Sequence, residues 1–136
     1  MNHWLVKSDP ETYSWPDLLK DGSTVWDGVR NHLAKRHLAS MKKNDKVLVY
    51  HSMGESSVVG TATVIREGFE DPKAPGEGWV AVELKAGKSL KRPVTLKEIK
   101  SDKILKGMEL VRMSRLSVMP VRPEEYDKIL ELASSK

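Results

Sequence analysis

Short apolar segments separated by polar turns recur along the chain, and their patterns predict several strands. Residues 46–52 (KVLVYHS) are mostly apolar and rich in β-formers, which is typical of a buried central strand. Residues 79–84 alternate between apolar and polar positions, the period-2 pattern of a strand with one buried face. The strands expected from these patterns cover residues 3–6, 46–52, 58–66, 79–84 and 116–121.

Helix-start signals and one apolar stripe predict helices between these strands. Ser14 is expected to cap a short helix, and Thr95, three residues before Glu98, has capping-box spacing. Residues 32–41 place their apolar side chains on one helical face, and Pro123 begins a terminal helix. The sequence therefore predicts short helices among the strands and at the end of the chain.

The chain shows no repeat and no linker that would divide it, so we expect one domain over residues 1–136. Residues 25–28 (VWDG) and the Pro- and Gly-containing segment 67–78 are predicted loops, the latter between two strands. Strands mixed with short helices indicate the α+β class with a mixed, curved sheet. We expect this sheet to close into a small barrel, although the pattern alone predicts only the class.

Composition excludes several kinds of site. There is no cysteine, which rules out disulfides, thiolate catalysis and cysteine-based zinc sites. No apolar run is long enough to cross a bilayer and no signal peptide is recognisable, so we expect a cytoplasmic protein without membrane contact. His32 and His37 are five residues apart, which does not suit a metal site on one helix face. Glycine-rich nucleotide motifs, HExxH and a nucleophile elbow are absent from the sequence, so no cofactor or metal is expected.

The net charge of +4 is distributed unevenly. Residues 85–115 carry ten Lys or Arg and three Asp or Glu, and residues 30–46 carry six basic residues and Asp45 alone. These two segments form either ordinary solvated faces or one surface that contacts phosphates.

Trp26 is the first candidate for a ligand contact, because it lies in an expected loop beside Asp27 and Gly28. Its indole either fills the core or offers a stacking platform to a planar ring. Gly28 would let the backbone approach a ligand closely. Asn31 either caps the next helix or presents its amide to a base edge, and Arg30 either holds a phosphate or pairs with an acid.

Polar residues also gather where expected strands begin or end. They are Lys7 and Ser8 after the first strand, His51 and Ser52 at the end of the central strand, and Ser114, Arg115 and Leu116 before the last. Each group is either an ordinary strand end or a set of polar groups available to a bound ring. Convergence of these ends would form a pocket.

These residues lie in segments that resemble the EVE domain family, within the PUA-like group that includes YTH and ASCH domains. The matching segments, which span essentially the whole chain, are HWLVKSDP (3–10), WDGVRN (26–31), VYHS (49–52), VG (59–60), SRLSV (114–118) and PV (120–121). The resemblance implies a small mixed β-barrel flanked by short helices, with a pocket beside it. YTH relatives hold methylated adenine of RNA in an aromatic cage, and EVE domains are implicated in reading methylated or hydroxymethylated cytosine in DNA.

The resemblance gives Trp26 the position of a cage wall and residues 7–8 the position of the pocket rim. Family members often read Tyr-Gln-Ala-Arg-Asn where residues 32–36 read HLAKR, which changes the expected readout of the base edge. The second and third cage tryptophans of YTH domains have no counterpart here. Trp15 and Trp79 are instead expected to be packing residues.

The sequence thus predicts a non-catalytic module that binds nucleic acid through a modified base of the methylated cytosine or adenine class. Two alternatives remain open: an RNA-binding housekeeping module acting on tRNA or rRNA, and an enzyme acting on a nucleoside or another small molecule. The expected base pocket comprises Lys7, Ser8, Trp26, Asp27, Gly28, Asn31, His51, Ser52, Ser114 and Leu116. Phosphate contacts are expected from Arg30, Lys35, Arg36 and Arg115.

Overall fold

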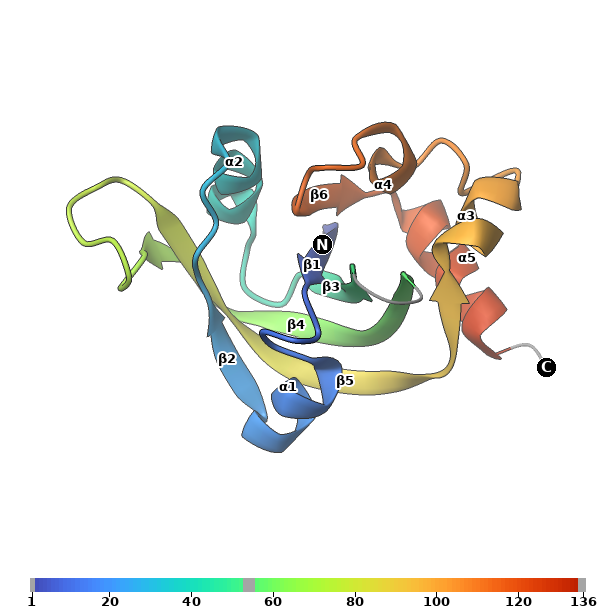
Figure 1. Cartoon of the computed structure of the whole chain (residues 1–136), viewed down its shortest axis with the longest axis horizontal. Helices are drawn as coiled ribbons and strands as arrows, with labels where there is room; N and C mark the ends of the chain where they lie inside the picture. Colours follow the sequence, from blue (N-terminus) through green and yellow to red (C-terminus); the bar gives the residue numbers. More distant parts are fainter. Residues whose placement is uncertain (1, 53–55, 135–136) are drawn as a thin grey trace.

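A six-stranded mixed sheet forms the centre of the protein (Figure 1). The computed structural model describes residues 2–52 and 56–134. The strands are β1 (His3–Ser8), β2 (Ser23–Trp26), β3 (Lys46–His51), β4 (Ser57–Glu70), β5 (Val80–Thr95) and β6 (Val118–Val121). The helices are α1 (Trp15–Asp21), α2 (His32–Ser40), α3 (Leu96–Ser101), α4 (Glu109–Arg112) and α5 (Pro123–Ser134). The α+β class expected from the sequence is confirmed.

The strand order is β2-β5-β4-β3-β1-β6. β1 pairs in parallel with β3 and antiparallel with β6, which makes the sheet mixed. The β4–β5 ladder shifts register repeatedly, and such irregularities bend a sheet. Figure 1 shows both as long, curved strands, with α2 above one end and α3 and α5 at the other. No ladder joins β2 to β6 within the described residues, so closure into a barrel stays a prediction.

The core lies where the sheet packs against the helices, and Trp15 is one of its main contacts. A Cβ added at Gly60 on β4 would overlap the Trp15 indole, so glycine at this position makes room for the ring. The indole Nε1 donates a hydrogen bond to Ser89 Oγ at 2.8 Å. Trp15 is therefore a packing residue, as expected from the sequence.

Buried Asp45 ties the start of the chain to the turn before β3. Its carboxylate accepts hydrogen bonds from Trp4 Nε1 at 2.9 Å, from the backbone N of Lys42 at 2.9 Å and from the backbone N of Asn2 at 3.1 Å. Burial by itself would raise the pKa of Asp45, but these donors outweigh it and hold the pKa below its usual value. The carboxylate stays charged because every donor around it favours the charged form.

Both expected caps are present, whereas several strands differ from the sequence prediction; β4, for example, continues to Glu70, into the segment that was expected to be a loop. Ser14 and Thr95 each form a capping box, at α1 and α3 respectively. Trp26 was expected in a loop, but it is the last residue of β2, whose four residues pair with β5. β5 was expected to end at residue 84, but it continues to Thr95, because β4 supplies backbone partners as far as Ser57.

In the part of the chain that the structure describes, no helix is both long enough and apolar enough to span a membrane.

Candidate functional site

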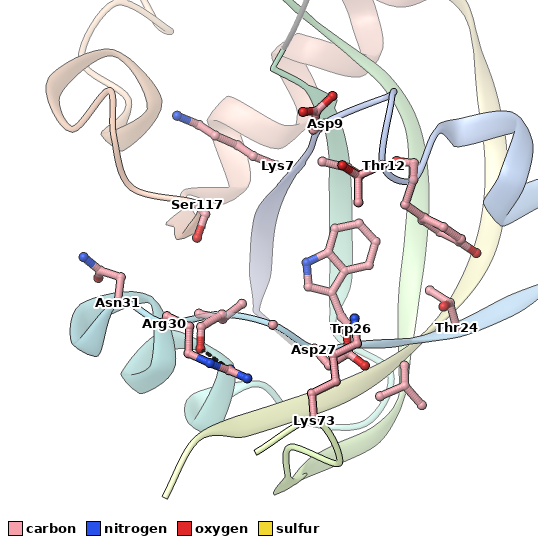
Figure 2. A pocket seen from close by; sticks show the side chains of 15 residues that line it. Lys7, Asp9, Thr12, Thr24, Trp26, Asp27, Arg30, Asn31, Lys73 and Ser117 are labelled. Carbon is pink, nitrogen blue, oxygen red and sulfur yellow. Dashed lines mark hydrogen bonds and ion pairs between the residues drawn. The ribbon is translucent and has the colours of Figure 1, made fainter. Parts of the chain in front are cut away.

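A cavity of about 570 Å³ opens where β1 and β2 end and α2 begins (Figure 2). Its volume falls within the range of about 300–1,000 Å³ that is common for small-ligand pockets. The residues that line it are Lys7, Ser8, Asp9, Thr12, Tyr13, Thr24, Val25, Trp26, Asp27, Gly28, Val29, Arg30, Asn31, Lys73 and Ser117. Seven of these residues were expected from the sequence: Lys7, Ser8, Trp26, Asp27, Gly28, Arg30 and Asn31.

Trp26 forms one wall of this cavity. The residue is only 9% exposed, and Tyr13 packs edge-on against its indole, with ring centroids 6.3 Å apart at 83°. Figure 2 shows the nitrogen-bearing edge of the indole turned toward open space between Lys7, Ser117 and Arg30. Trp26 therefore both packs against its neighbours and presents part of its ring to the cavity.

The indole N–H of Trp26 differs from those of the two other buried tryptophans, Trp4 and Trp15. Trp4 Nε1 donates to Asp45 and Trp15 Nε1 donates to Ser89. Trp26 Nε1 donates to no acceptor among the residues that the structure describes. An indole N–H on a largely buried ring is usually paired, so this donor is available to a bound molecule.

The end of β1 supplies polar groups at the cavity rim. Lys7 Nζ donates to the carbonyl of Ser114 at 2.7 Å and lies 5.8 Å from the centroid of the Tyr50 ring. Burial lowers the pKa of Lys7 from its usual value. Ser8 Oγ donates a hydrogen bond to the carbonyl of Tyr13, which leaves its oxygen able to accept but not to donate.

A buried carboxylate, Asp71, holds the segment that follows Trp26. Its oxygens accept from the backbone N of Gly28 at 2.9 Å, from Arg30 Nη1 at 2.9 Å and from the backbone N of Lys73 at 2.7 Å. The side chain is fully buried. Burial would raise the pKa of Asp71, but the bonds from Arg30, Gly28 and Lys73 outweigh it and lower the pKa below its usual value. Asp71 thereby fixes two cavity-lining residues, Gly28 and Arg30, from a loop more than forty positions away.

The wall between Trp26 and α2 depends on two local features. Gly28 has φ 78°, a left-handed conformation that favours glycine. Asn31 is the N-cap of α2, and its Oδ1 accepts from the backbone N of Ala34 at 2.9 Å. Its amide NH₂ group makes no hydrogen bond to the rest of the described chain, so Asn31 both caps the helix and keeps a donor at the cavity.

The charged groups that line the cavity nearly balance one another. Lys73 pairs with Asp27 at 3.0 Å, and Arg30 pairs with Asp71 at 2.9 Å. Lys7 is the remaining cation of the lining. The rim therefore offers cationic contacts without a large uniform positive field.

Several residues expected in the pocket lie elsewhere. His51 does not line the cavity: its Nε2 accepts the backbone N–H of Trp15 at 2.9 Å, and burial lowers its pKa. The backbone N–H of Ser52 donates to the Ser8 carbonyl at 3.1 Å, which makes Ser52 part of the β1–β3 edge. Ser114 and Leu116 line a neighbouring hollow of about 360 Å³, which Asn31 shares. The parallel pairing of β1 and β3 places His51 opposite Ser8, but the His51 ring points toward α1, where it bonds Trp15.

The four residues expected to contact phosphates lie in different places. Arg30 lines the cavity, and Arg115 lies in the neighbouring hollow. Lys35 lies beside Trp79, and Arg36 is exposed on α2 outside the lining. No residue of the basic 85–115 segment is part of the cavity lining, and Lys88 and Lys91 instead line a groove between β4, β5 and α5.

The sequence prediction missed several lining residues. They are Asp9, Thr12, Tyr13, Thr24, Val25, Val29, Lys73 and Ser117. Lys73 lies in the Pro- and Gly-containing loop, which the bonds of Asp71 to Gly28 and Arg30 and the Lys73–Asp27 ion pair hold at the cavity. The one local signal was an Asp followed by Pro in that loop, a common turn start that does not reveal a distant partner.

Comparison with known proteins gives consistent matches over nearly the whole chain. The EVE domain model matches residues 2–132. Thymocyte nuclear protein 1 of Rattus norvegicus is 31% identical over 169 residues, which cover 99% of this chain and 75% of the relative. A solved protein of Rhodopseudomonas palustris is 41% identical with a TM-score of 0.93, covering 98% of this chain and 93% of that one.

Two further structures widen the comparison. Human THYN1, solved in complex with DNA containing 5-methylcytosine, is 29% identical with a TM-score of 0.92, covering 100% of this chain and 99% of that one. An ASCH protein of Zymomonas mobilis is 14% identical with a TM-score of 0.60, covering 97% of this chain and 99% of that one. At that identity the ASCH protein shares the fold alone.

Proposed function

This chain belongs to the EVE domain family, and we propose that it binds a modified nucleobase, with 5-methylcytosine in DNA as the first candidate, and does not transform it. The observation that carries the proposal is the partly open Trp26 ring beside a cavity of the size of a small ligand. The relative that was solved with 5-methylcytosine DNA matches this chain along its full length, which supports the choice of ligand.

The donors around the cavity suit the edge of a base. A pyrimidine presents carbonyl and ring-nitrogen acceptors, and Trp26 Nε1 and the Asn31 amide are donors that the described chain leaves unused. Stacking of a base on an aromatic ring contributes about 1–3 kcal/mol. A buried methyl group adds about 0.8 kcal/mol, so the methyl by itself gives a preference of only a few-fold.

A base must leave its stack to reach this cavity, and the strand that carries it then passes the rim. Lys7, Arg30 and Lys73 lie there and provide phosphate contacts that add affinity without reading sequence. Such binding weakens as salt rises. The cavity thus selects the base, and the cationic rim binds the phosphate backbone.

The test is a set of titrations by calorimetry with three kinds of ligand: 5-methyl-2′-deoxycytidine alone, short single-stranded DNA with one 5-methylcytosine or one cytosine, and unmodified RNA of the same length. We expect Trp26→Ala to weaken binding of the methylated ligands about 10-fold or more, from lost stacking and a lost hydrogen bond. Trp26→Phe keeps a ring face but lacks the N–H, so its loss is expected to be smaller, about 2- to 10-fold.

Phe69→Ala is the matched control, because Phe69 is a partly buried aromatic residue on β4 outside the cavity lining. Thermal melts of all three variants exclude unfolding as the cause. Binding of every ligand by Trp26→Ala at parental affinity would refute the proposal. Tight binding of unmodified RNA would favour the RNA-binding alternative, and conversion of the nucleoside to a product would favour an enzyme.

A further inference from the structure

A second aromatic and basic cluster lies beside the cavity and shares only Arg30 with its lining. It consists of Trp79, which precedes β5, and of His32, Lys35 and Arg30 at the start of α2. The His32 and Trp79 rings stack with centroids 5.0 Å apart and planes at 28°. Arg30 Cζ and Lys35 Nζ lie 5.5 and 5.6 Å from the Trp79 ring centroid. Trp79 was expected to be a packing residue, yet it is only half-buried and serves as the centre of this cluster.

Among the described residues, no carboxylate pairs with one of the two cations of the cluster. Arg30 is paired with Asp71, although its side chain is still 39% exposed. Lys35 forms no ion pair with any residue that the structure describes. Its ammonium group and the Arg30 guanidinium both lie within 6 Å of the Trp79 ring centroid, so two cationic side chains flank one half-buried aromatic ring.

His32 provides the second element of a nucleotide site. It is exposed, and Trp79 supports its ring by stacking, so the His32 ring is held in place with part of its surface in solvent. Single-stranded nucleic acid is bound by this combination of cationic groups for the backbone and ring faces for the bases. The His32 ring also marks the position at which this chain departs from the common family pattern.

We propose that this cluster, hereafter the flanking site, binds the nucleotide next to the one held in the cavity. Lys35 and Arg30 contact its phosphate, and its base stacks on the exposed part of His32. Arg30 connects the two sites physically, because the same side chain lines the cavity and lies over Trp79. This inference rests on the proposed base-binding function, and it adds that the chain reads a strand of at least two nucleotides.

The two sites make different predictions for short and long ligands. A free nucleoside fills the cavity and has no flanking nucleotide, so the flanking site adds nothing to its binding. We therefore expect His32→Ala and Lys35→Ala to bind 5-methyl-2′-deoxycytidine as the parent does. For single-stranded DNA with one central 5-methylcytosine, His32→Ala should weaken binding about 5-fold or more.

Lys35→Ala should weaken oligonucleotide binding and lower the slope of log affinity against log salt by about 1. Lys103→Ala is the matched control, because Lys103 is exposed and lines neither site. Lys103→Ala removes one positive charge outside the cluster, so it measures how much the loss of any surface charge weakens DNA binding. Fluorescence anisotropy with labelled DNA over a salt series measures both quantities, and thermal melts confirm folding.

The results distinguish failure of this inference from failure of the proposed function. The inference is overturned if His32→Ala matches the parent and Lys35→Ala matches Lys103→Ala on the oligonucleotide, while Trp26→Ala still loses binding. It is also overturned if His32→Ala loses nucleoside affinity as much as oligonucleotide affinity, because the ring would then belong to the base cavity. If neither ligand binds the parent protein, both proposals fail together.

Discussion

Replacing Asp71 with alanine removes the acceptor shared by two backbone N–H groups and the Arg30 guanidinium. A hydrogen bond to a charged group contributes about 1.5–3 kcal/mol, and a buried donor left without a partner costs a similar amount. Arg30 is 39% exposed, so water can solvate it again and part of the ion pair is recovered. The loss then comes mainly from the N–H groups of Gly28 and Lys73, and we expect a decrease of about 2–4 kcal/mol in the free energy of unfolding.

The measurement is urea denaturation followed by circular dichroism, with Asp27→Ala as the control. Asp27 pairs with Lys73, whose side chain is 66% exposed, so its loss should cost less than about 1 kcal/mol. Because Asp71 also fixes the segment that lines the cavity, the Asp71 variant should bind the methylated nucleoside more weakly. A change within about 0.5 kcal/mol of the control would refute the idea that Asp71 holds this segment.

The pH dependence gives an independent check of the same carboxylate. The pKa of Asp71 is lower in the folded protein than in the unfolded chain, so its contribution is fully present above the unfolded pKa of about 4. That contribution is lost as the pH falls through the lower, folded pKa. The Asp71 variant should therefore lose less stability than the parent in acid. The pKa of Asp45 is also lowered in the folded protein, but Asp45 is present in both the parent and the variant, so its effect on stability cancels in the comparison.

Two further predictions concern the packing of Trp15. Gly60→Ala should destabilise the fold by about 1–3 kcal/mol, because the added Cβ overlaps the Trp15 indole. Gly107→Ala is the control, since a Cβ there meets open space and should leave the melting temperature nearly unchanged. Equal melting temperatures of the two variants would contradict this account. Burial lowers the pKa of His51, whose unprotonated Nε2 accepts the Trp15 N–H, so stability should be complete above pH ~6.5 and fall as the pH drops through the folded pKa. His51→Gln should flatten this part of the stability profile in urea titrations at several pH values, and an unchanged slope would show that His51 is not the titrating group.

The helix starts illustrate how much of the fold follows from local sequence. Ser14 and Thr95 form their capping boxes with residues three positions away, so the pattern that predicts each cap also contains its partner. The central strand β3 was likewise predicted, because an unbroken apolar run of that length is typical of burial on both faces. These elements depend on interactions between near neighbours or on the simple separation of apolar residues from water.

The candidate site was predictable to a smaller extent. Trp26 and the residues after it were identified because a tryptophan in an expected loop is costly unless it packs or binds, and because residues 26–31 (WDGVRN) resemble the EVE domain pattern. His51 was expected in the pocket but does not line the cavity, because its position opposite Ser8 in the strand register does not determine which neighbour its imidazole contacts. Lys73 could not be found, because it is held at the cavity by contacts between distant segments, those of Asp71 with Gly28 and Arg30 and its own ion pair with Asp27.

The sequence by itself determined the α+β class, the capped helices and the Trp-Asp-Gly segment at the centre of the site. Only the tertiary structure decided that Trp26 ends a strand, that its N–H has no acceptor among the described residues, and that His32, Arg30 and Lys35 lie around Trp79. The physical reason is the range of the interactions. Caps and apolar periodicity act over a few residues, whereas a cavity is the space left between segments that pack from distant parts of the chain.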